Sequence, residues 1–211
     1  MIIHINNLGG FIMSKVLVLY SSPITKEKSA TYAVTKKFVE EYKKNNSEDE
    51  ITEFDLNQLE MSLSGMNSNN FSSFFNEELS DKYIEILKNT DKLIIASPMI
   101  NFNVPTVLKT FIDRIAVANK TFSYKYAKKG SSIGLLDHLK VQIIASQGAP
   151  YGWYLWASHV SYLEGVWNFL GAKITKTILI DGTKVAPFNT YTPEQIVDAK
   201  IDEIKSAATS F

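Results

Sequence analysis

The chain contains no cysteine. Disulfides, thiolate nucleophiles, iron–sulfur clusters and cysteine-based zinc sites are therefore excluded. Any redox chemistry has to come from a bound cofactor instead. Histidine is also scarce: His4, His138 and His159 are scattered and lack the spacing of metal ligands. Each of them is expected to be a structural or surface residue, and no metal site is predicted.

An excess of charge of one sign is lacking as well, because 22 basic side chains balance 22 acidic ones and the formal net charge is zero. A nucleic-acid-binding face would need a basic excess. A soluble electron carrier usually steers to its partners with a strongly signed surface. The balance therefore argues against a nucleic-acid partner and mildly against a carrier.

Long hydrophobic runs are absent too, and nothing approaches the roughly 20 apolar residues of a membrane-spanning helix. The opening dozen residues have no basic start and are interrupted by asparagine and glycine, so they do not resemble a signal peptide. Met13 is a plausible native start, and residues 1–13 are interpreted as an N-terminal extension. The expectation is a cytoplasmic protein without a membrane partner.

Short apolar runs of strand length are present at residues 16–19, 93–96, 141–145 and 177–180. Such nearly continuous runs are typical of strands that are buried on both faces, as in a parallel sheet covered by helices. A weaker, alternating run at residues 50–56 predicts a half-exposed edge strand. Five strands are therefore expected.

Helical patterns fill the intervals between these runs. They predict helices at residues 29–45, 76–89, 105–118 and about 155–170, and a last helix that opens with the capping box at residues 192–195. This alternation predicts a doubly wound α/β domain with helices on both faces of the sheet. No linker or repeat divides it, so one domain is expected over residues 14–211.

Two connections are unusually long. Residues 57–75 are rich in serine and asparagine, which predicts a long surface loop. Residues 119–140 are expected to carry a small excursion such as a hairpin.

The loops after the first, third and fourth strands are the candidate site. In an open parallel sheet, ligands bind beyond the carboxyl ends of the strands, beside the point where strand order reverses. The loops at residues 21–31, 97–103 and 146–153 are rich in hydroxyls, amides, small residues and aromatics rather than in acids. We call them the first, second and third loops.

In the first loop, Ser22, Ser29 and Thr31 lie at or near the start of a predicted helix. Free N–H groups and the positive end of the helix dipole favour a phosphate there. Neither GxGxxG nor GxxxxGK[ST] is present, so dinucleotide and P-loop sites lack support. The same pattern is typical of an ordinary helix cap by Ser29, and this alternative stays open.

The second and third loops have the composition that a flat, polar-edged ring requires. Such a ring needs apolar packing on a face and backbone N–H and C=O groups along its edge. Asn101 and Asn103 are also typical of a plain turn. Gly148 would let the backbone approach the ring closely. The aromatic run at residues 151–156 is more typical of a core or a dimer interface than of a substrate platform.

Hydrolytic chemistry finds no support in the sequence. There is no GxSxG motif, and the first and third strands do not end in the aspartates of a receiver-type phosphorylation site. Acidic side chains do not cluster in the sequence, so neither a general-base pair nor a metal-binding site is predicted.

At these loops the chain resembles the FMN-dependent NADH-azoreductase family, also described as NADH:quinone oxidoreductases of the flavodoxin-like superfamily. The resemblance runs from about Ser14 to the last helix. Its most specific stretch is Ser97-Pro98-Met99-Ile100-Asn101-Phe102-Asn103-Val104-Pro105, with Lys120-Thr121-Phe122-Ser123-Tyr124 and Phe169-Leu170-Gly171 as further similarities. The resemblance implies a flavodoxin-like sheet of five parallel strands in the order 2-1-3-4-5, and a homodimer with flavin sites near the interface.

The resemblance also implies the cofactor and its contacts. FMN is expected to contact Ser22, Ser29, Ala30, Thr31, Pro98, Met99, Ile100, Asn101, Phe102, Ser146, Gln147, Gly148 and Ala149. NADH or NADPH would reduce it, and a quinone or an azo compound would oxidise it in the same pocket by ping-pong two-electron transfer. Phe102, Phe122 and Tyr124 are the candidates for lining that pocket. No side chain is expected to be catalytic, because the flavin carries the electrons.

The chain departs from the family where family members usually carry Tyr in place of Ile100, and often a basic residue and a second Gly in place of Gln147 and Ala149. These departures bear on substrate preference and flavin potential. The alternatives are a non-enzymatic flavodoxin-like carrier, an acyl carrier protein phosphodiesterase and a cofactor-free interaction module.

Overall fold

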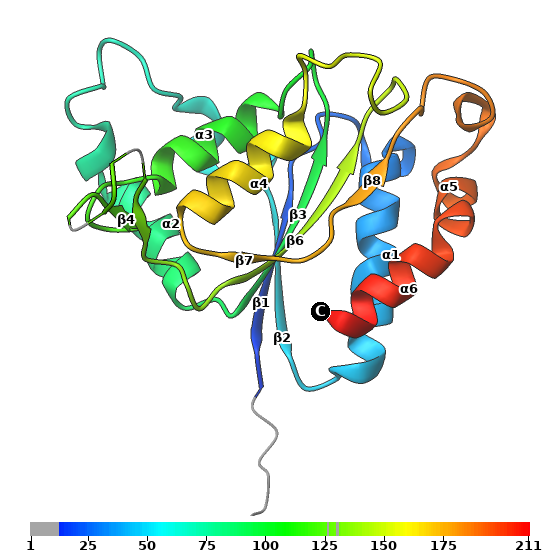
Figure 1. Cartoon of the computed structure of the whole chain (residues 1–211), viewed down its shortest axis with the longest axis horizontal. Coiled ribbons are helices and arrows are strands. Elements are labelled where there is room, and N and C mark those ends of the chain that lie inside the picture. The colour runs from blue at the N-terminus through cyan, green and yellow to red at the C-terminus, as the bar shows by residue number, and fades with distance from the viewer. Residues whose placement is uncertain (1–12, 126, 130) are drawn as a thin grey trace, which may run out of the picture.

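The computed structural model describes residues 13–125, 127–129 and 131–211. Apart from Met13, the predicted N-terminal extension lies outside the described residues. A twisted parallel sheet forms the centre of the molecule (Figure 1). Its long strands are β1 (Lys15–Tyr20), β2 (Glu50–Asp55), β3 (Lys92–Pro98) and β6 (Lys140–Ser146). They lie in the order β2-β1-β3-β6, as predicted for the first four strands.

The strand predicted at residues 177–180 is present, but a further short strand precedes it, so the fifth position of the sheet is not one continuous strand. Two short strands, β7 (Lys173–Ile174) and β8 (Ile178–Ile180), pair with β6 in turn. The fully buried Gln142 of β6 explains the break. Its amide donates to the Lys176 carbonyl at 3.0 Å and accepts from the Thr175 hydroxyl at 2.7 Å. Because a buried amide needs partners, the interrupted strand satisfies it.

Helices cover both faces of the sheet (Figure 1). One face carries α1 (Ala30–Asn45), α5 (Pro193–Ala199) and α6 (Ile201–Ser210), and the other carries α2 (Glu78–Lys88), α3 (Thr106–Ile115) and α4 (His159–Phe169). Alternate strand residues feed the two cores, so that Leu17 and Ile95 pack beneath α3 while Val18 and Ile94 pack beneath α1. The doubly wound α/β prediction is confirmed. The predicted last helix is two helices that meet at Lys200.

The segment predicted as a surface loop at 57–75 is held more firmly than expected. It forms the short 3₁₀ turns η2 (Leu56–Gln58), η3 (Glu60–Leu63) and η4 (Phe74–Asn76). Arg114 of α3, only 1% exposed, donates to the Ser64 carbonyl at 2.8 Å and pairs with Glu77. Its guanidinium also lies 4.0 Å from the centre of the Phe74 ring. A buried arginine thus ties this segment to α3.

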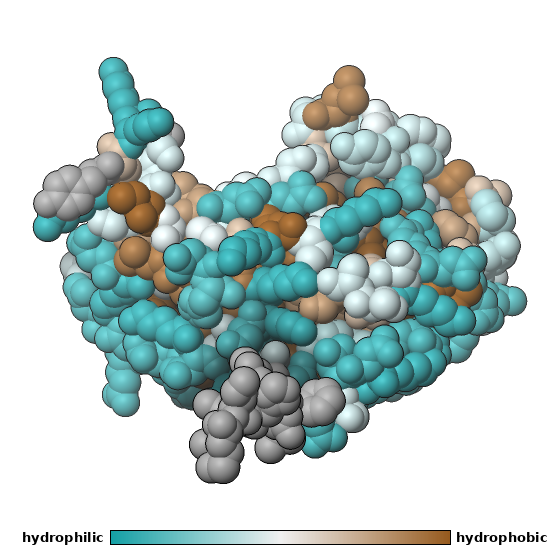
Figure 2. Space-filling view, turned by 60° about the horizontal axis from the view of Figure 1, so that its bottom comes forward, coloured by the Kyte–Doolittle hydropathy of each residue, from teal (hydrophilic) through white to brown (hydrophobic). Residues whose placement is uncertain are grey.

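The other long connection contains the expected excursion. Strands β4 (Phe122–Ser123) and β5 (Ile133–Gly134) pair in an antiparallel arrangement. The end of the sheet where the strands begin is mainly hydrophilic (Figure 2). In the part of the chain that the structure describes, no helix has the length and apolar character needed to cross a membrane.

Candidate functional site

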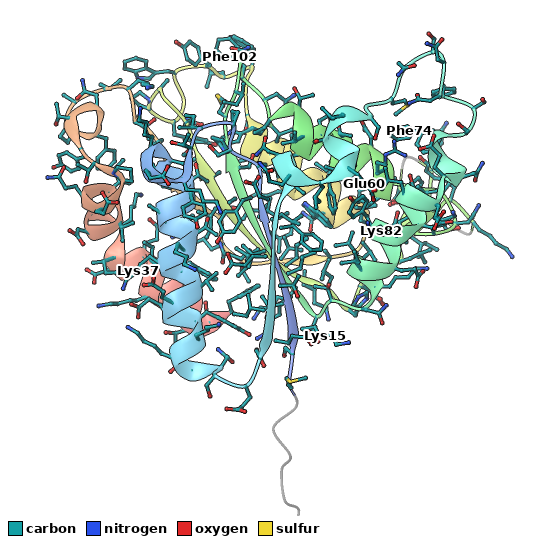
Figure 3. The ribbon with its side chains drawn as sticks, turned by 180° about the vertical axis from the view of Figure 1, so that it is seen from behind. Lys15, Lys37, Glu60, Phe74, Lys82 and Phe102 are labelled. Atoms are coloured by element: carbon teal, nitrogen blue, oxygen red, sulfur yellow. The ribbon has the colours of Figure 1, made fainter. Side chains whose placement is uncertain are left out.

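The three loops meet at the carboxyl end of the sheet, as the topology predicts. Figure 3 shows Phe102 at this end of the molecule and Lys15, which begins β1, at the other. The Met99 N–H donates to the Ser146 carbonyl at 2.6 Å, which joins the second loop to the third. The hydroxyls of Thr31 and Ser146 lie 2.5 Å apart, which joins the first loop to the third. The convergence is therefore fixed by direct contacts.

The first loop contains the helix cap that was left open as an alternative. Ser29 caps α1, since its hydroxyl accepts from the Tyr32 N–H at 3.2 Å and also donates to the Ser22 hydroxyl at 3.2 Å. The N–H groups of Ala30 and Thr31 meet no acceptor among the described residues. Two free donors at the positive end of a helix, beside the Ser22 hydroxyl, suit a phosphate group.

The second loop is a tight turn with unusual backbone angles. Ile100 and Asn103 exchange two backbone hydrogen bonds, of 2.8 and 3.1 Å. Between them, Asn101 and Phe102 have φ angles of 45° and 71°, in the left-handed region. Such angles cost on the order of 1–3 kcal/mol each in non-glycine residues and cluster at binding sites. The N–H groups of these two residues have no acceptor in the described part of the chain.

The third loop is held by a segment that the sequence did not point to, residues 181–184. The carbonyl of Gln147 accepts from the Thr183 N–H at 3.1 Å, and those of Gly148 and Ala149 accept from the N–H groups of Lys184 and Gly182 at 2.9 and 3.0 Å. The only available signal was position: this segment follows the predicted strand at 177–180 and so has to end at the same edge of the sheet.

The three aromatic residues predicted to line the substrate pocket lie in two separate clusters. Phe102 packs on Tyr154 and Trp156, with ring centres 5.3 and 4.6 Å away. Phe122 and Tyr124 instead pack on each other, 5.3 Å apart, beyond the far end of α3. Since the second loop precedes α3 and β4 follows it, a helix of ~15 Å separates the clusters. Within one chain, Phe102 therefore belongs to one cluster, and Phe122 and Tyr124 belong to the other.

The three loops offer hydrogen-bond donation by backbone groups. No group of three or more His, Cys, Asp or Glu side chains that could hold a metal occurs in the described ranges. What the loops present is a set of free N–H groups, at Ala30 and Thr31, at Asn101 and Phe102, and at Gly148 and Ala149. One pair suits a phosphate and the others suit the polar edge of a flat ring, so the residues present fit FMN.

Known proteins resemble this chain over nearly its whole length. The Flavodoxin_2 family model, described as a flavodoxin-like fold, matches residues 14–206. A Metamycoplasma arthritidis protein named FMN-dependent NADH:quinone oxidoreductase is 64% identical, with 83% of this chain and 89% of that protein covered. A Mesoplasma florum protein named FMN-dependent NADH:quinone oxidoreductase 1 is 50% identical over 94% of this chain and all of that protein.

Solved structures of azoreductases superpose on this chain over nearly its whole length. An azoreductase from Bacillus anthracis superposes with a TM-score of 0.80 at 25% identity, covering 94% of this chain and all of its own. An FMN-dependent NADH-azoreductase from the same organism, in complex with FMN, gives a TM-score of 0.73 at 25% identity, covering 93% and 98%.

His159 lies beneath the second loop and takes no part in the site's donor set. It is the first residue of α4, is fully buried, and neither ring nitrogen has a hydrogen-bond partner within the described residues. Burial lowers the pKa of His159 from its ordinary value to about 4, an effect that the nearby Ser97 backbone only partly opposes. The side chain is therefore neutral in the folded protein at neutral pH.

The depressed pKa of His159 predicts acid sensitivity. The unfolded chain takes up a proton near pH 6.5 and the folded chain only near pH 4, so His159 contributes stability above pH 6.5 that is lost as the pH falls towards 4. The loss should reach about 3 kcal/mol. Urea unfolding at several pH values should show a flatter profile for His159→Gln than for the wild type.

Proposed function

Because the chain belongs to the Flavodoxin_2 family of flavodoxin-like fold, we infer that it is an FMN-dependent NADH:quinone oxidoreductase. The observation that carries this inference is that relatives bearing this name align with nearly the whole chain. The azoreductases among the structural neighbours extend the expected oxidants to azo compounds. A carrier, a phosphodiesterase and a cofactor-free module are not favoured by any of these comparisons.

We propose that the three loops hold FMN. When bound, FMN supplies the electron relay from the nicotinamide to the quinone or azo compound. The free N–H groups of Ala30 and Thr31, with the Ser22 hydroxyl, would hold the phosphate. The ring would lie against the second and third loops, where backbone donors meet its polar edge. The full proposed contact set is Ser22, Ser29, Ala30, Thr31, Pro98, Met99, Ile100, Asn101, Phe102, Ser146, Gln147, Gly148 and Ala149.

We propose a homodimer with the flavin sites near its interface. The support is twofold. The run at residues 151–156 exposes large apolar side chains, including Leu155 at 92% and Trp156 at 72%, and exposed apolar patches of this kind mark interaction surfaces. Phe122 and Tyr124 lie in a different cluster from Phe102, so a pocket shared between copies is a way for all three to line it. Light scattering should report a dimer at micromolar concentration, and a monomer would contradict the proposal.

We also propose a cellular location and a role for the N-terminal residues. The proposed location is the cytoplasm, which cell fractionation tests. Residues 1–13 are proposed to be an extension that precedes the flavin-binding domain. Removing them should leave the free energy of unfolding and FMN affinity unchanged, and a loss of either would contradict this view.

The purified protein should be yellow, with FMN released intact on denaturation because no cysteine is present to tether it. It should oxidise NADH with a quinone and no other protein. Because nicotinamide and oxidant share one pocket in this proposal, initial-rate lines at several quinone concentrations should be parallel. Intersecting lines would indicate two separate sites, and a protein that stays colourless after incubation with excess FMN would refute the proposed function.

The roles of the Ser29 and Thr31 hydroxyls can be distinguished by comparing the binding of FMN with that of riboflavin. The Thr31 hydroxyl lies against the Ser146 hydroxyl. If it exchanges that partner for the phosphate when FMN binds, Thr31→Val should weaken FMN binding by about 10- to 100-fold, since a charge-assisted hydrogen bond is worth roughly 1.5–3 kcal/mol. Riboflavin, which lacks the phosphate, should lose little. Ser29→Ala removes the α1 cap, so it should lower the free energy of unfolding by about 1 kcal/mol and weaken both flavins alike. Titration of both ligands into both apo variants measures this; equal losses in Thr31→Val would assign that hydroxyl to the helix and not to the phosphate.

A further inference from the structure

The segment that follows β8, residues 181–184, is bonded to the third loop along its whole length. The Gln147 N–H donates to the Ile180 carbonyl at 2.9 Å, and the Thr183 hydroxyl donates to the Gln147 carbonyl at 3.1 Å, beside the backbone bonds from 182–184 described above. The Tyr151 N–H in turn donates to the Asp181 carboxylate at 2.8 Å. The loop and the segment therefore form one unit.

The hydrogen bonds from residues 182–184 occupy the backbone carbonyls of the third loop but not its N–H groups. The carbonyls of Gln147, Gly148 and Ala149 are all occupied, whereas the N–H groups of Gly148 and Ala149 have no acceptor among the described residues. Gln147 does not alter this balance, because it is only 8% exposed and its amide turns back to donate to the Ala149 carbonyl at 3.0 Å. The third loop thus offers hydrogen-bond donors and no charge of its own.

The cationic side chain of Lys184 lies against this loop. A methyl group added to Gly148 would come within 2.9 Å of Lys184 Cγ and 3.5 Å of its Cβ, so the lysine stem packs directly on the glycine. Lys184 is exposed, and only the Cδ and Cε carbons join its ammonium to the Cγ that packs on Gly148. In the described part of the chain no carboxylate forms a salt bridge with Lys184, and Asp181 is engaged by the Tyr151 N–H.

We propose that Lys184 is a redox-tuning residue, whose ammonium beside Gly148 stabilises the negative charge that FMN acquires when it is reduced. The proposal rests on the proposed function and on the placement of the ring edge at the third loop. A hydride from the nicotinamide brings two electrons and one proton, and the oxidised nicotinamide leaves. The ring therefore gains one negative charge until it takes up a second proton.

A nearby positive charge stabilises such a charge, and two oriented N–H donors add to this because backbone donors require no reorganisation when it forms. Charge near the ring nitrogens is one of the means by which a protein sets flavin electronics. Oxidised FMN carries no such ring charge, so Lys184 should favour the reduced form selectively. It would make the bound flavin easier to reduce without adding much to the affinity for oxidised FMN.

Lys184→Met tests this directly, because methionine retains much of the apolar stem on Gly148 and removes the charge. The preference for reduced over oxidised FMN should fall about tenfold, which lowers the two-electron midpoint potential by about 30 mV. The affinity for oxidised FMN should change less than threefold. Lys184→Arg, which keeps the charge, should stay near the wild-type potential. In the reduced protein, the pKa of the ring should rise in Lys184→Met, as followed by absorbance against pH.

Lys173 is the matched control, since it is an exposed lysine at the start of β7, at the other end of the sheet. Lys173→Met changes the net charge equally and should leave the potential unchanged. The proposal is overturned if Lys184→Met keeps the wild-type potential, if Lys184→Arg falls as far as Lys184→Met, or if Lys173→Met falls as well. Failure of the wild type to bind FMN would instead refute the proposed function, so the two failures are distinguishable.

Discussion

The parallel register of β1, β3 and β6 is the constraint on which every proposed ligand contact depends. Tyr20 pairs with Ala96, and Pro98 pairs with Ser146, so the three strands end at nearly the same level of the sheet. Ser146 is the common point, because it accepts from the Met99 N–H and lies against the Thr31 hydroxyl. A slip of one residue in β6 would turn Ser146 to the other face. Both contacts would then be lost, and the three loops would no longer meet.

All three loops present backbone N–H groups that lack an acceptor among the described residues, but the physical reason differs from loop to loop. At Ala30 and Thr31, free donors follow from the geometry of any helix start. At Asn101 and Phe102 they follow from left-handed backbone angles, whose cost is borne by the surrounding fold. At the third loop they follow from a neighbouring segment that occupies the carbonyls. Because the proposed FMN contacts are made by backbone groups, the side chain of Ile100 does not need to supply a donor.

The parts of the fold that the sequence predicted are those that local pattern encodes. The apolar runs at residues 16–19, 93–96 and 141–145 became β1, β3 and β6, and the loops after them became the candidate site. The parts that it missed depend on partners distant in sequence. The break in the fifth strand is set by Gln142, and the order of the segment at 57–75 by Arg114. Neither interaction leaves a periodic signal, since each is made by one residue.

At the third loop, the residue that maintains the loop's shape and the residue that carries the positive charge are at different positions. The Gln147 amide closes on the Ala149 carbonyl and so maintains the shape of its own loop. A cation that packs on the loop comes from Lys184, on the segment after another strand. Gly148 connects the two functions, because any side chain there would displace the lysine stem. In the proposal above, Lys184 supplies the positive charge at the ring edge, while Gln147 stays free to hold the loop.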